Sequence, residues 1–265
     1  MRAKSWVVHV FAVILISTLM SCTGKAVKVG VEEPEPELKK ERLDETAALL
    51  ERLVSFNKKA SFIEGDAFVI YKDDEQTYSF RVHAIADMSR KNYKLSVDEY
   101  VFKIPLFTLI KNQSDVLAIT HSKKTYALLR YEDLDFSSVT DLHIPKEFFI
   151  HAVFGAFYVI EGSKKFSSPE EHILLMETAN RKQKVLFSEE MLPVESSYTL
   201  SDKFVQVQFS KFREVESVQF PHKITIRNDE RNLKINYSKL HINTPLHSST
   251  FALDTSGLEK YSRTQ

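Results

Sequence analysis

The feature that most limits the fold is a two-residue hydrophobic alternation that recurs along the chain after Ser61. Apolar side chains at every second position alternate with polar ones, and a β-strand places such positions on opposite faces of a sheet. In the clearest runs the apolar residues at alternate positions are Tyr78, Phe80, Val82 and Ala84; Tyr93, Leu95 and Val97; Val205, Val207 and Phe209; Ile224 and Ile226; and Leu233, Ile235 and Tyr237. One face of the predicted sheet is therefore dry and the other is wet.

Polar turn sequences separate these runs at a spacing typical of hairpins. The turn sequences are Lys72-Asp73-Asp74-Glu75, Lys111-Asn112-Gln113-Ser114 and Arg227-Asn228-Asp229-Glu230. The runs between them predict about eleven strands. No strand–helix–strand rhythm appears, so the pattern predicts an antiparallel sheet.

Two segments depart from this period and predict helices. Residues 38–57 carry an amphipathic stripe. Its members are Leu43, Ala47, Leu50 and Val54, widened by Leu49, Leu53 and Phe56. Pro145 to Ile160 starts with a residue favoured at the first helical position and is apolar nearly all round, so it must be buried or cover an apolar surface. We expect an α+β domain in which both helices cover the concave face of a curved sheet.

The first 22 residues have the pattern of a targeting segment. Arg2 and Lys4 precede an apolar run of about 15 residues, which is shorter than the roughly 20 that a membrane-spanning helix needs. The run ends in Leu19-Met20-Ser21-Cys22. This resembles the lipobox of bacterial lipoproteins and implies that residues 1–21 are a signal peptide and that Cys22 is the lipid attachment site. An ordinary signal peptide and an uncleaved anchor are the alternatives.

Residues 22–36 predict a flexible tether, and residues 37–265 predict one domain. The tether has no apolar periodicity and is rich in Gly, Pro and Glu. Two or more acyl chains on Cys22 give stable membrane attachment. Thr23 stands where an Asp marks inner-membrane retention in enterobacteria, so we expect outer-membrane delivery. The domain then faces the periplasm, with exposure at the cell surface as the open alternative.

Composition and motifs exclude several kinds of site. The 36 Lys and Arg balance the 36 Asp and Glu, which removes the main electrostatic support for nucleic-acid binding. One Cys permits neither an internal disulfide nor a multi-Cys zinc site. The sequence holds no G-x-S-x-G, P-loop, G-x-G-x-x-G or H-E-x-x-H motif. We expect no metal, no cofactor and no catalytic residue, hence no enzyme. A hydrolase with carboxylates distant in sequence is the alternative.

The order of elements resembles that of the LolA- and LolB-like lipoprotein-localisation factors over about residues 38–265. The motifs that carry the resemblance are Leu95-Ser96-Val97 leading into Ile104-Pro105-Leu106-Phe107, Leu142-His143-Ile144-Pro145, Gln219-Phe220-Pro221 and Phe251-Ala252-Leu253. The resemblance implies an unclosed barrel of about eleven strands, capped by helices around a hydrophobic cavity. LolB is an outer-membrane lipoprotein and LolA a soluble carrier, so the lipobox favours the LolB-like side.

The family resemblance also implies a protruding, membrane-inserting loop between the third and fourth strands. Here the corresponding segment is residues 98–105. Its apolar residues are Tyr100, Val101, Phe102 and Ile104, with Val101 and Phe102 as the tip. The alternative is that this segment continues the third strand and turns its side chains into the core.

A second candidate site is the lining of the cavity, because acyl chains need apolar walls without convergent polar groups. The candidate lining residues are Phe68, Ile70, Phe80, Val82, Leu95, Val97, Phe154 and Phe157. Ordinary core packing is the alternative for each of them. A domain of this size needs such residues with or without a ligand.

These features together predict a membrane-anchored lipoprotein that binds lipid or acylated lipoprotein cargo and passes it to the outer membrane. The expected partners are membrane lipid, the acyl chains of lipoproteins and a periplasmic LolA-like carrier. The alternative function is a non-enzymatic envelope assembly or interaction lipoprotein whose cavity is filled.

Overall fold

The computed structural model describes residues 36–261, apart from Asp74, 135–144, Lys164, 201–202 and Ser248. The chain divides into two compact units, Met1–Pro36 and Glu37–Gln265. The predicted signal peptide, Cys22 and the tether up to residue 35 lie outside the described residues. The sheet and the hydrophobic core belong to the second unit.

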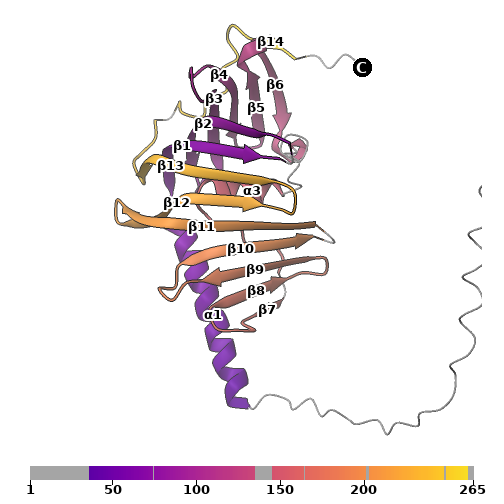
Figure 1. Ribbon diagram of the computed structural model, residues 1–265, viewed down its shortest axis with the longest axis vertical. Helices are drawn as coiled ribbons and strands as arrows, with labels where there is room; N and C mark the ends of the chain where they lie inside the picture. Colours follow the sequence, from indigo (N-terminus) through magenta and orange to yellow (C-terminus); the bar gives the residue numbers. More distant parts are fainter. Residues whose placement is uncertain are drawn as a thin grey trace, which may run out of the picture. The chain divides into compact units, whose positions relative to one another are not determined.

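This unit is mostly β, with one large sheet (Figure 1). Its strand order is β14-β6-β5-β4-β3-β2-β1-β13-β12-β11-β10-β9-β8-β7. The strands are β1 (Phe62–Lys72), β2 (Thr77–Asp87), β3 (Asn92–Glu99), β4 (Pro105–Asn112), β5 (Asp115–Thr120), β6 (Thr125–Arg130), β7 (Lys165–Ser167), β8 (Ile173–Glu177), β9 (Arg181–Phe187), β10 (Pro193–Leu200), β11 (Lys203–Val215), β12 (Val218–Arg227), β13 (Asn232–Ile242) and β14 (Glu259–Lys260).

The antiparallel, unclosed sheet is confirmed, but the expected strand count is wrong. The structure has 14 strands rather than about eleven. β7 has 3 residues and β14 has 2, which is too short for an alternation to show in the sequence. β14 is also the exception to the antiparallel rule, because it pairs with β6 in parallel. β14 and β7 end the strand order, so the sheet does not close on itself.

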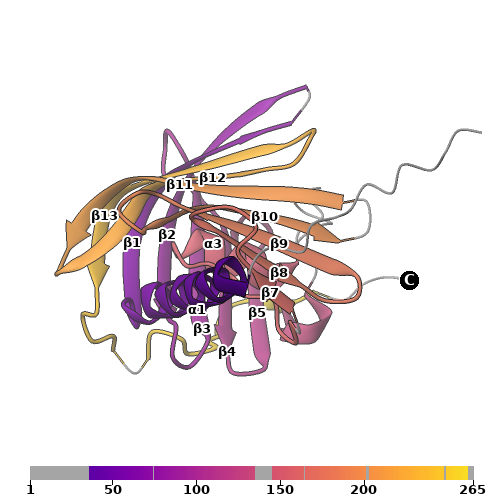
Figure 2. The same ribbon diagram turned by 90° about the horizontal axis from the view of Figure 1, so that it is seen from below.

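Two α-helices occur in the described part of the chain, together with the short 3-10 helices η1 (His121–Lys123) and η2 (Tyr131–Asp133). The α-helices are α1 (Pro36–Lys58) and α3 (Lys146–Val153). Both lie on the concave side of the sheet (Figure 2). Their buried side chains join those of β1–β5 and β8–β13 in one hydrophobic core.

The amphipathic helix is confirmed, but the centre of its buried stripe is not where the sequence placed it. Leu43 is 67% exposed, and Ala47 and Val54 also face solvent. The residues that meet the sheet are Thr46, Leu49, Leu53 and Phe56. The helix is therefore rotated toward its larger apolar side chains, which bury more area than Ala47 and Val54 do.

The second helix is shorter than predicted, because it ends at Val153 rather than at Ile160. Gly155 follows with a positive φ of 64°. Its N–H donates to the carbonyl of Ala152 at 3.0 Å, and the N–H of Ala156 donates to that of His151 at 2.8 Å. These two bonds form a Schellman motif, which ends a helix at a left-handed glycine. A Cβ on Gly155 would also lie 2.5 Å from the ring of Phe220.

A second, smaller hydrophobic cluster lies at the β4–β6 end of the sheet. It contains Ile85, Ile110, Leu117, Ile119 and Phe251, with Leu246, Leu253 and Leu258 packed against it. The segment after β13 therefore covers β2, β4 and β5 on the face opposite the helices. The motif Phe251-Ala252-Leu253, which contributed to the family resemblance, belongs to this cover.

Candidate functional site

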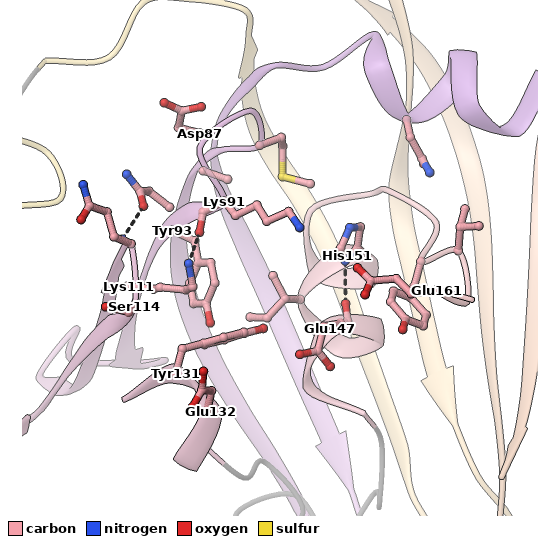
Figure 3. Close-up of a pocket in the computed structure, with 18 of the residues that line it drawn as sticks. Asp87, Lys91, Tyr93, Lys111, Ser114, Tyr131, Glu132, Glu147, His151 and Glu161 are labelled. Carbon is pink, nitrogen blue, oxygen red and sulfur yellow. Dashed lines mark hydrogen bonds between the residues drawn. The ribbon is translucent and has the colours of Figure 1, made fainter. Parts of the chain in front are cut away.

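A pocket of about 890 Å³ lies beside α3 (Figure 3). Its walls come from the end of β2, the turn into β3, the end of β4, η2, α3 and residues 157–161. This volume lies within the usual range for small-molecule sites, roughly 300–1,000 Å³. Beside the pocket, buried side chains of the main core pack between the sheet and the two helices.

The wall formed by residues 157–161 is irregular backbone, and two amide side chains hold it. Asn57 of α1 donates to the Phe157 carbonyl at 2.7 Å and accepts from the Phe157 N–H at 2.8 Å. Gln183 of β9 donates to the Tyr158 carbonyl at 2.5 Å and accepts from the Ile160 N–H at 3.2 Å. Buried backbone outside a helix or sheet needs such partners. The two amides therefore fix the shape of this wall.

The pocket has an apolar part and a polar part. Ala86, Ile150, Phe157 and Ile160 supply buried apolar surface, and Met88 and Val159 add partly buried side chains. Tyrosines, lysines and carboxylates line the remainder. The site thus differs from the purely apolar cavity expected from the sequence.

Lys111 is the most deeply buried cation of the pocket, with 5% of its surface exposed. Its ammonium donates to the Lys91 carbonyl at 2.5 Å. The same ammonium lies 4.9 Å from the ring centre of Tyr131 and 5.8 Å from that of Tyr93. Burial, and secondarily the positive charge of Lys91, lower the pKa of Lys111. The protein thus holds a cation where water stabilises it poorly.

The tyrosines of the pocket stay protonated at neutral pH. Burial, with a smaller contribution from the charge of Glu147, raises the pKa of Tyr131 to about 12. The pKa of Tyr93 is raised further, chiefly by burial and next by its neighbour Tyr131. Tyr93 is 3% exposed, and its hydroxyl has no hydrogen-bond partner at bonding distance among the described residues. These hydroxyls are therefore available as hydrogen-bond donors.

His151 and Glu147 occupy the α3 side of the pocket. The His151 Nδ1 hydrogen-bonds with the Glu147 carbonyl at 2.7 Å, and the imidazole lies edge-on to the Tyr158 ring at 5.7 Å between centres. Burial lowers the pKa of His151, so the ring is neutral at pH 7. The carboxylates of Glu147 and Glu161 lie on this side as well (Figure 3).

The β3–β4 connection forms the second candidate site, and its apolar side chains are exposed. The exposed fractions are 41% for Tyr100, 65% for Val101, 78% for Phe102 and 55% for Ile104. We call Val101, Phe102 and Ile104 the hairpin tip. The alternative, in which this segment continues β3 into the core, is wrong.

Backbone hydrogen bonds give the hairpin tip a defined shape. The Glu99 carboxylate accepts from the N–H of Val101 at 3.0 Å and of Phe102 at 2.6 Å. These two bonds lower the pKa of Glu99. The Glu99 N–H donates to the Ile104 carbonyl at 2.8 Å and closes the loop. The apolar side chains are thus held outward by polar contacts beneath them.

Tyr100 is held against the outer face of the sheet. Its ring lies 4.6 Å from that of Phe68 and 5.3 Å from the Arg81 guanidinium, and Arg81 donates to the Tyr100 carbonyl at 3.0 Å. Tyr100 therefore belongs to the base of the loop rather than to its exposed end.

The predicted cavity lining divides into three groups. Phe68 and Ile70 are misassigned, because they lie on the opposite face of β1 from the buried Ala67 and Val69. Phe80, Val82 and Leu95 are partly buried against the main core, and Val97 pairs across from Val82. Phe154 and Phe157 are buried in the core. Of the eight, Phe157 alone lines the described pocket.

Sequence patterns did not single out the pocket's polar residues. The alternation predicts Tyr93 on the dry face of a strand, and the polar sequence around Lys111 predicts a turn, whereas Lys111 lies within β4 and is buried. Tyr131 follows β6, and Glu147 and His151 belong to α3. No local motif connects positions so far apart in the chain.

The described residues offer neither a metal centre nor a membrane-spanning helix. They contain no group of three or more His, Cys, Asp or Glu side chains placed to hold a metal ion. In the same part of the chain, no helix combines the length and apolar character needed to cross a membrane.

No protein-family model and no curated protein match this chain. Solved structures with a similar fold include a LolA superfamily protein from Nitrosomonas europaea, with 12% identity and a TM-score of 0.52, covering 78% of this chain and 96% of that one. An outer membrane lipoprotein-sorting protein domain from Vibrio parahaemolyticus has 11% identity and a TM-score of 0.50, with coverages of 80% and 97%. A DUF1329 family protein from Desulfovibrio piger has 11% identity and a TM-score of 0.52, with coverages of 78% and 97%. The domain therefore has a LolA-like fold.

Proposed function

We propose that this protein is a lipid-anchored, LolB-like lipoprotein of the outer membrane that binds lipid or the acyl chains of lipoproteins and passes them to the bilayer. The observation that carries the proposal is the pocket of about 890 Å³, set beside α3 on a LolA-like fold. Cargo is bound and released without covalent chemistry, so the protein is not an enzyme. A periplasmic LolA-like carrier supplies the cargo.

The hairpin tip supports the membrane part of this proposal. A Phe that is 78% exposed beside a Val that is 65% exposed is costly in water and favourable in a bilayer interface. The caps from Glu99 keep both side chains outward before any membrane is met. In the proposal the tip inserts among lipids, while Cys22 holds the chain on the membrane through its acyl chains.

The direct test loads the full-length, lipid-modified protein with a fluorescent fatty-acid analogue and mixes it with vesicles of outer-membrane phospholipid. The proposal expects stoichiometric binding, followed by transfer that slows when both Val101 and Phe102 are replaced by Glu. Absence of binding by the folded protein contradicts it. Mass spectrometry of the mature N-terminus tests the anchor separately, since an unmodified Cys22 removes that part of the proposal.

One observation favours the second candidate, an assembly lipoprotein with a filled cavity. Phe154 and Phe157 are buried where a larger cavity was expected. Depletion followed by membrane fractionation separates the two functions. Lipoproteins retained in the inner membrane or periplasm support the proposal, whereas normal lipoprotein sorting with defects confined to another envelope assembly supports the second candidate.

A further inference from the structure

The pocket contains a buried positive charge that no carboxylate neutralises. In the part of the chain that the structure describes, neither Lys111 nor Lys91 forms an ion pair. Lys111 is 5% exposed and uses its ammonium on the Lys91 carbonyl and on the faces of two tyrosine rings. Buried charges are normally paired, because a lone one keeps its desolvation penalty. A site of this kind is completed by an anion.

Two tyrosine side chains flank this charge. Among the described residues, the buried Tyr93 hydroxyl has no partner at hydrogen-bond distance, although it interacts with the Tyr131 side chain. Tyr131, with its raised pKa, also keeps its proton. The two rings lie 6.1 Å apart at their centres, and both flank the Lys111 ammonium. Figure 3 shows the Tyr131 hydroxyl directed toward α3 and the Tyr93 hydroxyl directed toward Tyr131. An ammonium with adjacent hydroxyl donors matches an anionic oxygen group.

Four carboxylates line the pocket. Asp87 pairs with Arg90 and Glu132 pairs with Arg130, so each of these two has a cation of its own. Glu147 and Glu161 flank His151 on the α3 side (Figure 3). Glu147 raises the pKa of both tyrosines, whereas the pKa of Lys111 responds to burial and to Lys91. An anion is therefore favoured on the Lys111 side and repelled from α3.

The apolar part of the pocket can contact an alkyl chain attached to the anionic group. Ile150, Phe157 and Ile160 line the same space as Lys111 and Tyr93. A small inorganic anion leaves this surface uncovered, whereas an alkyl chain covers it. Head and chain are thus served by different walls of one pocket.

We propose that this pocket binds a single-chain amphiphile with an anionic oxygen head group, a carboxylate or a phosphate monoester, with the head on Lys111, Tyr93 and Tyr131. The chain lies along Ile150, Phe157 and Ile160. This inference rests on the proposed lipid-binding function and names the class of lipid that the pocket prefers.

The test is competition between palmitate and hexadecanol for the full-length protein in a non-ionic detergent, read by native mass spectrometry. The inference expects palmitate to be preferred at least about tenfold, since hydrogen bonds to charged groups are worth more than neutral ones. Lys111→Met removes the charge and keeps an unbranched side chain, so it abolishes the preference but retains hexadecanol. Lys234→Met, at an exposed position, leaves the preference intact.

The outcomes separate this inference from the proposed function. Equal binding of palmitate and hexadecanol to the unaltered protein overturns the anion site and leaves lipid binding standing. Binding of neither overturns both. Stronger binding of hexadecyltrimethylammonium than of palmitate also overturns the anion site, because it assigns the head group to Glu147 and Glu161.

One further variant and one further pair of ligands complete the test. Tyr93→Phe removes a hydroxyl that has no partner at hydrogen-bond distance among the described residues, so the fold is retained while palmitate binding weakens several-fold. If Lys111→Met does not fold, this variant carries the test, and unchanged palmitate binding in it overturns the role of the hydroxyl. Binding of hexadecyl phosphate and of inorganic phosphate is measured to tell a lipid head group from a free anion. Tighter binding of inorganic phosphate than of either palmitate or hexadecyl phosphate overturns the assignment to a lipid.

Discussion

The two ends of the β3–β4 hairpin handle polar and apolar groups in opposite ways. At the Asn92 end, Lys111 and Tyr93 are buried and their charge and hydroxyl face a pocket. At the Glu99 end, Val101 and Phe102 are exposed, and the polar Glu99 lies beneath them as a cap. β3 has 8 residues, so at about 3.3 Å per residue the ends are roughly 25 Å apart.

This separation divides the proposed function between two places. In the proposed function the pocket binds the lipid, and the tip contacts the membrane a strand length away. Under that proposal the tip holds the domain at the bilayer rather than lining the path of the lipid. Variants at one end are expected to leave the other end's property unchanged, which makes the two ends separable by experiment.

The largest effect is expected from Gly155→Ala, in the turn that ends α3. Alanine is strained at a φ of 64°, and its Cβ would meet the Phe220 ring at 2.5 Å. The free energy of unfolding should fall by about 3 kcal/mol, measured by denaturant titration, and lipid binding should fall with it. Gly162→Ala is the matched control, since Gly162 has a φ of 75° and no atom within 4 Å of the added Cβ. Equal losses in the two variants contradict the tight contact.

Asn57→Leu should have the next largest effect. The substitution removes both hydrogen bonds to the buried backbone of Phe157 and keeps the number and branching of the side-chain heavy atoms, so it should cost about 2 kcal/mol. Hydrogen exchange should accelerate at the Phe157 amide and stay unchanged at Val101 and Phe102. Asn180→Leu, in an exposed turn, is the control. Faster exchange at both ends of the hairpin contradicts their independence.

Membrane contact by the tip is tested with a tryptophan probe. The chain has a single Trp, Trp6, in the predicted signal peptide, so Phe102→Trp gives the mature protein one reporter. Brominated lipids in vesicles of outer-membrane phospholipid should quench the fluorescence of this Trp. Adding Val101→Glu should weaken tip insertion by about tenfold. Phe166→Trp on β7 is the control and should not be quenched. Equal quenching at both positions excludes a specific role for the tip.

The smallest effect is expected from protonation of Glu99. Its hydrogen bonds to the Val101 and Phe102 amides lower its pKa below the ordinary 4.5. A carboxyl whose pKa is lowered in the folded state stabilises the folded loop fully at a pH above its pKa in the unfolded chain. This stabilisation is lost as the pH falls through its pKa in the folded protein. Exchange of both amides should thus be slower than in Glu99→Gln at pH 6 and become similar in the two proteins once the pH falls below the lowered pKa of Glu99. Glu132→Gln is the control, and a difference that persists at low pH contradicts the cap.

Much of the fold was predictable because it follows from local periodicity. Val205, Val207 and Phe209 alternate with polar residues and are buried as expected. The face of β1 was not predictable, because residues 67–71 form a continuous apolar run in which either set of alternate positions suits the core. The smaller Ala67 and Val69 face the core, and Phe68 packs on Tyr100 outside it. A register shift between Asp66 and Ala67 adds to the ambiguity.

The two candidate sites also differ in how far the sequence predicts them. The exposed tip was predictable from the family resemblance, because it lies within one short segment. The pocket was not, since Tyr93, Lys111, Tyr131 and His151 meet through tertiary structure and carry no common motif. The end of α3 had a usable signal in Gly155, yet the apolar run beyond it favoured a longer helix. That run is instead buried as irregular backbone, held by Asn57 and Gln183.

The most direct test of the central claim is to locate bound lipid on the protein. A fatty acid carrying a photoactivatable group near the end of its chain is bound to the full-length protein and cross-linked, and the labelled peptides are identified by mass spectrometry. The proposal predicts labels on Ile150, Phe157 and Ile160, and loss of these labels when palmitate competes. Labels confined to the hairpin tip or the outer face of the sheet, with none in the pocket, would contradict it.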